Sequence, residues 1–593
     1  MRIFARIAVL VTIILSSTPF ANTQQMHLFS QDSNKHPVTN AATAPIKSWP
    51  LGHMYQGATS KHYSVTVNGK QIHMINNANS YHHGHFGMGF GQAFVKVQLL
   101  EPVLPLPADA TIRVSPEKHG IKADVNNNIV SFTLPHDGYY IIKIGTLKEI
   151  VLLADPPEIN VPDLESNDVH NVLALGASPN VTDAAGTTKA FQSALDKSGK
   201  DGKPVVVPPG VYFVKNLVLP SNSQLYLAPA AILRFTGKAA DYKVHWFKTS
   251  QNRNITWWIS TAFKSKNIRI WGRGILDGNG WEASTSGKIG NNILVPISTT
   301  DFYVEGITFR NGAGWTVTPI ATENVHMENV KVLNRLDMGE NDGFDVMHSN
   351  NVTITHSIAI ALDDPYSTKC WRMGTNIATS WPADAARDQT DVTINDALSW
   401  TRCFGLKVGQ GVDKNQSNIR FLNSTIYSAS IGIGVNHKWG TSNAYNILFE
   451  NIDIEATPLM LENRSSWEAM FTEGADKLGA GTVRGVTIRN VKVRRPGRTT
   501  AQLSGLNSER LIEQVTFENI WMPGMDRAAT SLKELNITDV RFAKDIFVNG
   551  RAQELVQEKK TQMETHGHKE VQKKLHEAVN MGRGLFHGDS HQK

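Results

Sequence analysis

The stretch Asn351-Val-Thr-Ile-Thr-His-Ser-Ile-Ala-Ile360 carries the pattern that decides the fold. It consists of a short strand rich in β-branched residues, a polar turn and a second strand. Similar units recur along the chain, and each begins with a turn-forming or polar residue followed by Val, Ile or Phe. Besides Asn351, the units begin at Asn267, Asp301, Asn324, Asp391, Asn418, Asn446, Gly485, Gln514 and Asn536.

The spacing of these units is that of a solenoid. Neighbouring starts are 23 residues apart from 301 to 324, 27 from 324 to 351, 27 from 391 to 418 and 28 from 418 to 446. Longer gaps, such as the 40 residues from 351 to 391, indicate one coil that carries an inserted loop. No helical period lies between the strands, so the repeat favours a parallel β-helix over a leucine-rich or helical array. We therefore predict an all-β chain with a parallel β-helix over residues 165–549.

Two segments in front of the repeat have different patterns. Residues 56–157 contain short runs of alternating polar and apolar residues, separated by Asn-Gly, Pro and Asp-Gly turns, which predicts a small antiparallel β-sandwich. After it, the stretch from Asp183 to Asp196 spaces its apolar residues as on one face of a helix. We expect this helix to cover the open end of the β-helix, because an uncapped stack would expose its apolar interior and a sheet edge.

The N-terminus predicts export. A basic head, Met1 to Arg6, precedes an apolar run from Ile7 to Leu15 and a small-residue region that permits cleavage after Ala21. We therefore expect a signal peptide over residues 1–21, a polar extension over 22–55 and a secreted protein, extracellular or periplasmic. The charged residues 550–593 predict a solvated tail. No segment reaches membrane length, so we expect no membrane association after signal cleavage.

Composition narrows the function classes. The formal charge of +6 is a mild basic excess, and no compact recognition motif accompanies it, so we expect no nucleic-acid partner. We also expect a monomer. The only two cysteines, Cys370 and Cys403, exclude a disulfide-dense scaffold, and pairing and separate burial both remain open. The His-rich stretch at Tyr81 lacks a carboxylate or cysteine at ligand spacing, so we expect no metal and no cofactor.

Three carboxylates are expected to meet on the β-helix. Asp342 lies in Glu340-Asn-Asp-Gly-Phe-Asp345, and Asp363 and Asp364 follow 21 and 22 residues later, which is about one coil. Equivalent positions of successive coils are neighbours in space, so like charges would raise one another's pKa. Acid–base cleavage of a glycosidic bond uses such a cluster, because one carboxyl has to be protonated while another is ionised. Calcium ligation or turn-forming aspartates are the alternative explanations.

This region resembles the family 28 glycoside hydrolases, the polygalacturonase group. Asn341-Asp-Gly and Asp363-Asp364 match two motifs of that family at its spacing, and Gly274-Ile-Leu-Asp-Gly-Asn-Gly-Trp281 is similar to a third. The resemblance covers roughly residues 165 to 545. It implies a right-handed, pectin-lyase-like β-helix and an inverting hydrolase. Asp363 would be the proton donor, and Asp342 with Asp364 would hold and deprotonate the attacking water.

The sequence departs from the family pattern at two motifs. Phe404 stands where the family has the histidine of Gly-His-Gly, and the segment from Gly432 to Lys438 replaces Arg-Ile-Lys. Since the family's basic pair binds the carboxylate of galacturonate, we expect Lys407, His437 and Lys438 to substitute as point charges. Flat aromatic residues near the site are further candidates for binding sugar rings. These are Trp281, Trp315, Trp371 and Trp439.

Two other functions remain open. A β-sandwich in front of a β-helix with clustered aspartates also resembles the layout of the family 49 dextranases, which implies a neutral glucan as substrate. A β-helix that binds carbohydrate without cleaving it is the alternative outside catalysis. Asp345 is a reserve candidate for the site. We expect it to point away from Asp342, because residues three apart in a strand face opposite sides.

Overall fold

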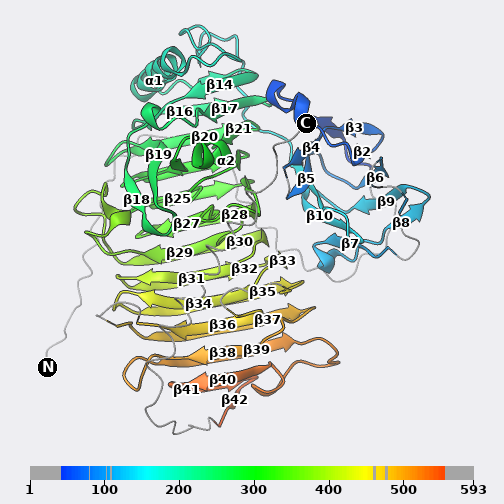
Figure 1. The fold of residues 1–593 in the computed structure, drawn as a ribbon, viewed down its shortest axis with the longest axis vertical. Coiled ribbons are helices and arrows are strands. Elements are labelled where there is room, and N and C mark those ends of the chain that lie inside the picture. Colours follow the sequence, from blue (N-terminus) through cyan, green and yellow to red (C-terminus); the bar gives the residue numbers. More distant parts are fainter. Residues whose placement is uncertain are drawn as a thin grey trace, which may run out of the picture. The chain divides into compact units, whose positions relative to one another are not determined.

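The computed structural model describes residues 42–554, except 79, 102, 104, 107–109, 459–462 and 475–478. The predicted signal peptide and most of the predicted C-terminal tail lie outside the described residues. The rest of the chain forms a β-sandwich followed by a right-handed parallel β-helix, as predicted (Figure 1). Two α-helices, α1 and α2, cover Ala184–Asp201 and Gly280–Thr285, and short 3₁₀ helices cover His53–Ala58, Glu117–His119, Ala239–Asp241, Thr249–Gln251 and Asn376–Ala378.

The sandwich consists of a six-stranded and a five-stranded sheet. Strand β6 alternates buried and exposed residues along its whole length, as the period-2 pattern predicts. All named strand pairs are antiparallel except β5 with β11, which run parallel. The first sheet comprises β1 (Ile46–Ser48), β4 (Met74–Asn77), β5 (Tyr81–Met88), β7 (Ile112–Ser115), β10 (Gly138–Ile144) and β11 (Ile150–Asp155), and the second β2 (Tyr63–Val67), β3 (Lys70–Ile72), β6 (Ala93–Leu99), β8 (Asp124–Asn126) and β9 (Ile129–Leu134).

The sandwich begins earlier than the sequence predicts. Strand β1 lies inside the stretch 22–55 that we expected to be a polar extension, and it pairs with β5 from Ile46 opposite Met88 to Ser48 opposite Phe86. Three residues carry too little alternation to reveal a strand. Only the neighbouring β5 supplies the hydrogen bonds that define it.

The expected capping helix is α1. The side chain of Asp183 accepts hydrogen bonds from the backbone of Ala185 and Gly186, which satisfies free N–H groups of the first turn. Gly202 ends the helix in the left-handed region with φ of 73°. The buried face, including Phe191 and Leu195, belongs to the core of the first coils. The helix lies at the N-terminal end of the stack (Figure 1).

The coils of the β-helix build a 20-stranded sheet, which is parallel except for its last pair of strands, and a second sheet on the other side of the core. The second sheet is four-stranded at first, with β15 (Leu217–Leu219), β18 (Trp246–Lys248), β19 (Arg253–Thr261) and β22 (Ile289–Val295), and then seven-stranded, with β27 (Phe344–Met347), β29 (Tyr366–Cys370), β31 (Phe404–Val412), β34 (Ile431–Trp439), β36 (Ser466–Thr472), β38 (Ala501–Ser504) and β40 (Ile537–Arg541). The strands of the 20-stranded sheet are β12 (His170–Asn171), β13 (Val205–Val207), β14 (Gly210–Val214), β16 (Gln224–Leu227), β17 (Ala231–Phe235), β20 (Lys266–Gly272), β21 (Ile275–Asp277), β23 (Thr300–Glu305), β24 (Thr308–Arg310), β25 (Glu323–Glu328), β26 (Lys331–Leu333), β28 (Asn350–Ile360), β30 (Gln389–Trp400), β32 (Gln416–Leu422), β33 (Thr425–Ser428), β35 (Ala444–Ile454), β37 (Val483–Val493), β39 (Ile512–Trp521), β41 (Ala543–Val548) and β42 (Arg551–Ala552).

The repeat starts found in the sequence have one backbone feature in common. All ten have positive φ, between 52° and 62°, and seven of the ten are Asn or Gly, which tolerate this left-handed conformation. Their side chains also form a ladder between coils. Asn324 Nδ2 donates to Asp301 Oδ1 at 3.0 Å, and Asn351 Nδ2 donates to Asn324 Oδ1 at 2.8 Å. The turn residues therefore set both the bend of each coil and its register on the next.

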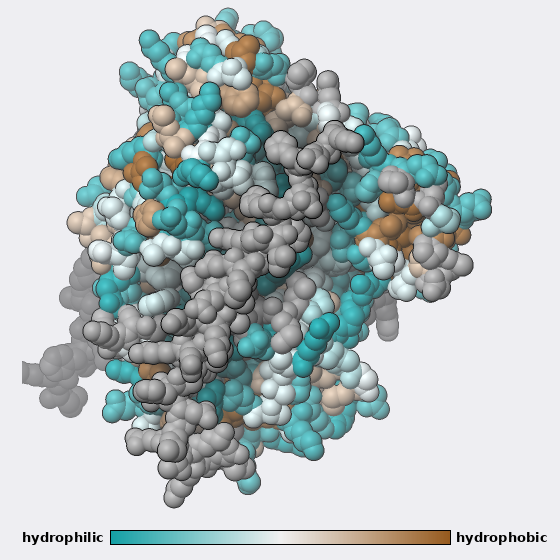
Figure 2. Space-filling model, viewed as in Figure 1, coloured by the Kyte–Doolittle hydropathy of each residue, from teal (hydrophilic) through white to brown (hydrophobic). Residues whose placement is uncertain are grey.

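The sandwich packs directly against the β-helix. Its residues Tyr139, Ile141, Val151 and Leu153 share one apolar cluster with strand residues of the β-helix, among them Ile358. This explains why β11 is buried along its whole length, since its sheet packs on the second sandwich sheet on one side and on the β-helix on the other. The described surface in Figure 2 is mainly hydrophilic, with a larger brown area over the sandwich. Within the described residues, no helix combines the length and hydropathy that crossing a membrane requires.

One buried carboxyl should weaken the fold at neutral pH. Glu468 in β36 is fully buried beside the core residue Ile433, and neither of its carboxyl oxygens has a hydrogen-bond partner within the described residues. Burial raises its pKa well above the usual value, so the folded protein keeps it protonated and loses stability as the pH rises above the unfolded pKa. We predict that Glu468→Gln raises the free energy of unfolding, by up to about 1.4 kcal/mol for each pH unit between the two pKa values.

Urea unfolding between pH 4 and pH 8 measures this effect. The gain should shrink toward zero at pH 4, where the carboxyl is protonated in both states. Glu513→Gln removes a carboxylate that is paired with Lys544 near the surface and serves as the control. A gain from Glu468→Gln that is equal at both pH values would contradict the prediction.

Candidate active site

The predicted carboxylates meet where two successive coils turn into the second sheet. Asp342 lies just before β27, and Asp363 and Asp364 lie just before β29. Phe344 of β27 pairs with Tyr366 of β29, so the register between the coils is 22 residues. The Gly343 amide also donates to the Asp364 carbonyl at 2.9 Å. The stacking of the coils thus brings Asp342 and Asp364 side by side, as their spacing predicts.

Two buried lysines neutralise part of this cluster. Lys369 Nζ lies 2.6 Å from Asp342 Oδ2, 2.7 Å from Asp345 Oδ1 and 3.6 Å from Asp364 Oδ2. Lys407 Nζ contacts Asp364 Oδ2 at 2.8 Å. The pKa of Lys369 lies well above its usual value because the three carboxylates outweigh the effect of burial. Lys369 therefore stays charged and holds three carboxylates in one place.

Asp345 contacts the same ammonium group as Asp342, which corrects the expectation that it points elsewhere. The expectation assumed strand alternation, but β27 begins only at Phe344, so Asp342 belongs to a turn. Alternation applies within a strand and fixes no side-chain direction in the turn before it. Ser367 also donates a hydrogen bond to Asp345 Oδ1.

Asp363 differs from its neighbours because no lysine contacts it among the described residues. Its side chain is half-buried, whereas Asp342 and Asp364 are fully enclosed. Burial raises the pKa of Asp363 to about 6, with further contributions from Asp364 and Glu340. One of its oxygens accepts a hydrogen bond from the Asp364 amide at 3.0 Å. At mildly acidic pH this carboxyl is partly protonated, and of the three predicted aspartates it is the least buried, so its proton is the most accessible.

Asp364 has the opposite environment. Burial alone would raise its pKa, but Lys407 and Lys369 outweigh burial, and the Cys403 thiol donates a further hydrogen bond at 2.9 Å. Its pKa is therefore lowered and the group is ionised. Burial raises the pKa of Asp342 well above the usual value, and only Lys369 opposes this. Its Oδ1 has no hydrogen-bond partner among the described residues, so one acceptor stays available.

Glu340 is a fifth carboxyl of the cluster, and sequence reasoning missed it. Single oxygens of Glu340, Asp342 and Asp363 lie within 4.8 Å of one another. Glu340 is held by Lys248 Nζ at 2.6 Å and by the Ser250 hydroxyl at 2.9 Å. These partners come from a coil about 90 residues earlier, so no local signal in the sequence reveals them.

Five carboxyls therefore face three ammonium groups. The carboxyls are Glu340, Asp342, Asp345, Asp363 and Asp364, and the ammonium groups belong to Lys248, Lys369 and Lys407. Full ionisation would leave a net charge of 3 − 5 = −2, which favours the retention of protons within the cluster. The sequence does contain a signal for Lys369. Tyr366 of β29 belongs to the core, so Ser367 and Lys369, at odd offsets from it, point to the opposite face of the strand.

The two departures from the family pattern lie next to each other in space. Lys407 pairs with Gly434 across neighbouring strands. A Cβ atom at Gly434 would lie 2.9 Å from Phe404 Cε1 and 2.2 Å from the Ala469 carbonyl oxygen, so no side chain fits there. The Phe404 ring, 4.7 Å from Lys407 Nζ, therefore occupies space above the segment that replaces Arg-Ile-Lys.

The other predicted cationic residues have different environments. His437 is buried, and its Nε2 lies 2.6 Å from the Ser442 carbonyl and accepts from the Gly481 amide at 3.0 Å, which ties it to the backbone. Lys438 lies 3.6 Å from Glu473, and Arg464, which the sequence did not indicate, lies 3.7 Å from the same carboxylate. The Arg464 guanidinium also covers the Phe471 ring at 4.1 Å.

The four tryptophans differ in exposure. Trp281 is 46% exposed, and the Arg335 guanidinium lies 4.1 Å from its ring. Trp315 is only 3% exposed, with Lys248 and Lys369 each about 5 Å from its ring. Trp371 is half-buried and stacks parallel to Trp315, with ring centroids 6.3 Å apart, and Trp439 is half-buried at the end of β34. Trp281 is thus the one of the four with a largely open ring.

Two groups of side chains at this site have the spacing of metal ligands. They are Glu340 with Asp342 and Asp363, and Asp363 with Asp364 and Cys403. Lys369 and Lys407 already occupy the space beside Asp342 and Asp364 with positive charge. The Cys403 thiol has a raised pKa because of burial and the two adjacent aspartates, so it is a poor thiolate ligand. Cys370 and Cys403 are both free and buried.

Comparisons with known proteins identify a family for most of the β-helix. The family model described as "Glycosyl hydrolases family 28" matches residues 203–540, which include all the carboxylates of the cluster. The chain is 28% identical over 251 residues to the exo-poly-alpha-D-galacturonosidase of Dickeya chrysanthemi, over 33% of this chain and 41% of that protein. It is 25% identical over 344 residues to the exopolygalacturonase of Zea mays, over 54% of this chain and 75% of that protein.

A solved structure shares the fold. The family 28 exopolygalacturonase of Yersinia enterocolitica matches with a TM-score of 0.50 and 16% identity, over 76% of this chain and 96% of that chain. At this identity the likeness shows the β-helix fold alone. The chain spans less than half the length of the Dickeya relative, and its β-sandwich lies outside the residues that the family model matches.

Lys369 should be essential to the stability of the site. We predict that Lys369→Met lowers the free energy of unfolding by about 3–5 kcal/mol at pH 7, because it leaves buried carboxylates without their counter-ion. The loss should be smaller at pH 4, where the carboxyls accept protons. Thermal unfolding at both pH values measures it. Lys544→Met, which removes an exposed partner of Glu513, should leave the midpoint unchanged, and an equally small effect of Lys369→Met would contradict the prediction.

Proposed function

The chain belongs to family 28 of the glycosyl hydrolases, and from this premise we propose that it hydrolyses glycosidic bonds of a pectin-type polysaccharide with Asp363 as the proton donor. One observation carries the proposal. Lysines contact Asp342, Asp345 and Asp364, whereas no lysine contacts the half-buried Asp363 among the described residues. The site therefore places a half-buried carboxyl with a raised pKa beside Asp364, which the lysines keep ionised, and general acid–base cleavage requires such a pair.

In the proposed reaction Asp363 gives its proton to the glycosidic oxygen as the bond from that oxygen to the anomeric carbon breaks. A water molecule held by Asp342 and Asp364 forms the new bond to the anomeric carbon and loses a proton to the ionised Asp364. Asp364 is ionised by its two lysines, and Asp342 offers the unpartnered Oδ1. Asp364 then releases its proton to solvent, and Asp363 takes up a proton from solvent. The sum is one water consumed and one glycosidic bond cleaved.

We propose that the configuration is inverted, as in the family this region resembles. Inverting enzymes separate the two carboxyl groups by about 6.5–9.5 Å, and retaining enzymes by about 5–5.5 Å. In this structure the nearest oxygens of Asp342 and Asp363 lie within 4.8 Å, a measure between single atoms rather than whole groups. The anomeric configuration of the first product, read by proton NMR, distinguishes inversion from retention.

An acidic pectin-type substrate is supported by two features. The curated relatives from Dickeya and maize are named for hydrolysis of galacturonans. On this chain, Lys438 and Arg464 share the single carboxylate Glu473 at 3.6 and 3.7 Å, which leaves one positive charge in excess. A uronate carboxylate can bind to these two cations where the Arg of the family motif is missing, and the planar guanidinium of Arg464 offers two parallel donors.

The neutral-glucan and binding-only alternatives make different predictions for the same protein. A dextranase-like enzyme would cleave dextran or pullulan, and the family 49-like layout on which it rests stays a prediction. A binding-only β-helix would release no reducing ends. The ordered lysine–carboxylate cluster favours catalysis, because a binding surface has no need of a buried excess of negative charge.

We also propose that the protein is exported and acts as a monomer. Secretion of a tagged full-length chain tests the export, and size-exclusion chromatography of the secreted protein tests the monomer.

The central test is the removal of the proposed acid. We predict that the purified protein releases reducing ends from polygalacturonate, and that Asp363→Asn lowers kcat at least about 1,000-fold while thermal stability stays unchanged. Rhamnogalacturonan, dextran and pullulan complete the substrate panel. Asp391→Asn changes an exposed aspartate in a turn of the solenoid and should leave the activity unaltered. Full activity of Asp363→Asn would refute the assignment of the acid, and cleavage of dextran or pullulan alone would favour the neutral-glucan alternative.

The proposed acid also predicts the pH dependence. Because Asp363 has to carry a proton and its pKa is raised to about 6, kcat/KM should fall as the pH rises through about 6. We expect a tenfold loss for each pH unit above that value. Initial rates between pH 4 and pH 9 at low substrate concentration measure this limb. A profile that stays flat from pH 5 to pH 8 would speak against a carboxylic acid as the proton donor.

A further inference from the structure

We propose that the β-sandwich positions the active site, because Ser80 and Tyr81 at the start of β5 hold the segment 334–343 that carries Glu340, Asn341 and Asp342. Ser80 and Tyr81 are positioning residues for the reaction. The inference rests on the proposed function for its activity readout, and on the conformation of the segment for a second readout that needs no substrate.

The segment 334–343 has no regular structure of its own. It leaves the core at the end of β26 and reaches β27 through turns and irregular backbone. Strand pairing therefore ends at Leu333 and resumes at Phe344. Between them, backbone hydrogen bonds to neighbouring coils among the described residues hold only the ends of the segment, at Asn334, Asp342 and Gly343. Since Glu340 and Asp342 lie in this stretch, their positions depend on contacts from other parts of the chain.

The sandwich supplies two of these contacts. Tyr81, which is fully buried, donates from its hydroxyl to the Asn334 carbonyl at 3.0 Å, across 253 residues of sequence. The Ser80 hydroxyl oxygen accepts from the Leu336 amide at 2.9 Å. The Leu336 side chain belongs to the same apolar cluster as the Tyr81 ring. The Asn334 carbonyl and the Leu336 amide are thus paired with the sandwich.

From Asn334 the contacts continue to both carboxylate-bearing turns. The Asn334 side chain donates to the Asn341 carbonyl at 2.7 Å and to the Thr316 hydroxyl at 2.7 Å. Asn341 Oδ1 accepts from the Leu362 amide at 2.9 Å, directly before Asp363. The Thr316 amide in turn donates to the Asp342 carbonyl at 2.9 Å. A displacement of Asn334 is therefore transmitted to Asp342 and to the Asp363 turn.

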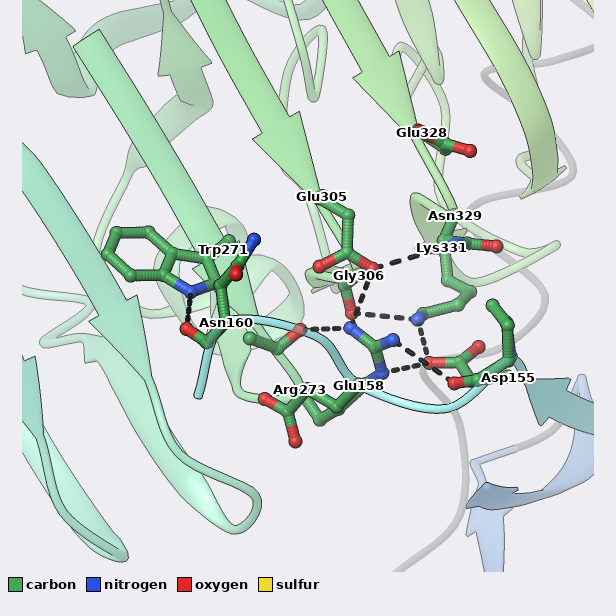
Figure 3. A network of polar contacts seen from close by, with 12 residues as sticks. Asp155, Glu158, Asn160, Trp271, Arg273, Glu305, Gly306, Glu328, Asn329 and Lys331 are labelled. Carbon is green, nitrogen blue, oxygen red and sulfur yellow. Dashed lines mark hydrogen bonds and ion pairs between the residues drawn. The ribbon is translucent and has the colours of Figure 1, made fainter. Parts of the chain in front are cut away.

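The sandwich is itself fixed to the strand that leads into this segment. Asp155 at the end of β11 contacts Lys331 Nζ at 2.6 Å, and Lys331 lies in β26, three residues before Asn334. Arg273 Nε and His85 Nε2 contact the same carboxylate at 3.1 and 2.8 Å. Figure 3 shows Arg273 and Lys331 converging on Asp155, with Glu305 on the other side of Arg273 at 2.8 Å.

This network makes the sandwich a fixed support. Asp155, Arg273 and Lys331 have fully buried side chains. Burial would raise the pKa of Asp155, but Lys331, His85 and Arg273 outweigh it and keep the carboxyl ionised. Separation of the sandwich would remove Asp155 from Lys331 and Arg273, and the loss of a charged partner is strongly unfavourable for buried groups. Ser80 and Tyr81 are therefore held at a constant distance from β26.

The test compares two tyrosines that each lose only a hydroxyl. Tyr81→Phe removes the hydrogen bond to the active-site segment. Tyr140→Phe removes an equally buried hydroxyl, which donates to the His136 carbonyl inside the sandwich at 2.9 Å. We expect Tyr81→Phe to lower kcat on polygalacturonate about 10- to 100-fold with KM within about twofold, because small misplacements of reacting groups are costly. Tyr140→Phe should leave kcat within about twofold.

Amide hydrogen exchange gives the second readout. Peptides covering residues 334–343 should exchange at least about tenfold faster in Tyr81→Phe and in Ser80→Ala, and not in Tyr140→Phe, while peptides from β28 and β30 stay unchanged in all three. Ser80→Ala removes the hydroxyl that accepts from the Leu336 amide. Because this side chain is partly exposed, the variant should fold, and it tests the inference even if Tyr81→Phe does not fold. Equal exchange of this segment in all variants, or equal loss of kcat in Tyr81→Phe and Tyr140→Phe, would overturn the inference. If the wild-type protein cleaves no substrate, the proposed function fails and hydrogen exchange alone decides the positioning.

Discussion

The rest of the structure depends on the in-register stacking of one coil on the next. Parallel strands pair residue by residue, and asparagine side chains at the left-handed turn positions repeat the same register outside the core. This constraint converts a sequence separation of 21 or 22 residues into direct contact between side chains. Asp342 and Asp364 are neighbours for that reason alone, and the close approach of like charges at the site is a consequence of the fold.

The same stacking supplies the charges that make this approach tolerable. Lys407 is aligned with Ser367, which in turn is aligned with Asp345, so three successive strands present one column of polar side chains. Lys369 and Lys407 keep Asp364 ionised, whereas burial, Asp364 and Glu340 raise the pKa of Asp363. The difference between Asp363 and Asp364 thus arises from the surroundings of each side chain, since both are aspartates.

The departures from the family pattern can be understood as one packing change. Phe404 replaces a polar residue and fills the space above Gly434, where a side chain cannot fit. The two departures therefore belong to one packed unit, and the cations Lys438 and Arg464 lie beside Glu473. The β-sandwich adds a second chain-specific feature. It covers strands that lead into the active-site turns, and it contacts an irregular segment that the solenoid itself leaves without strand pairing.

The sequence by itself determined the β-helix, its capping helix and the three aspartates, because each depends on a local period or on a spacing of one coil. The turn positions from Asn267 to Asn536 were all found in this way. Tertiary structure alone decided what lies in irregular backbone or comes from distant segments. It brought Asp345 beside Asp342, because strand alternation does not extend into a turn, and added Glu340, whose partners Lys248 and Ser250 lie about 90 residues away. It also brought Tyr81 to Asn334 across 253 residues, a contact set by packing between two sheets, for which no periodicity exists in the chain.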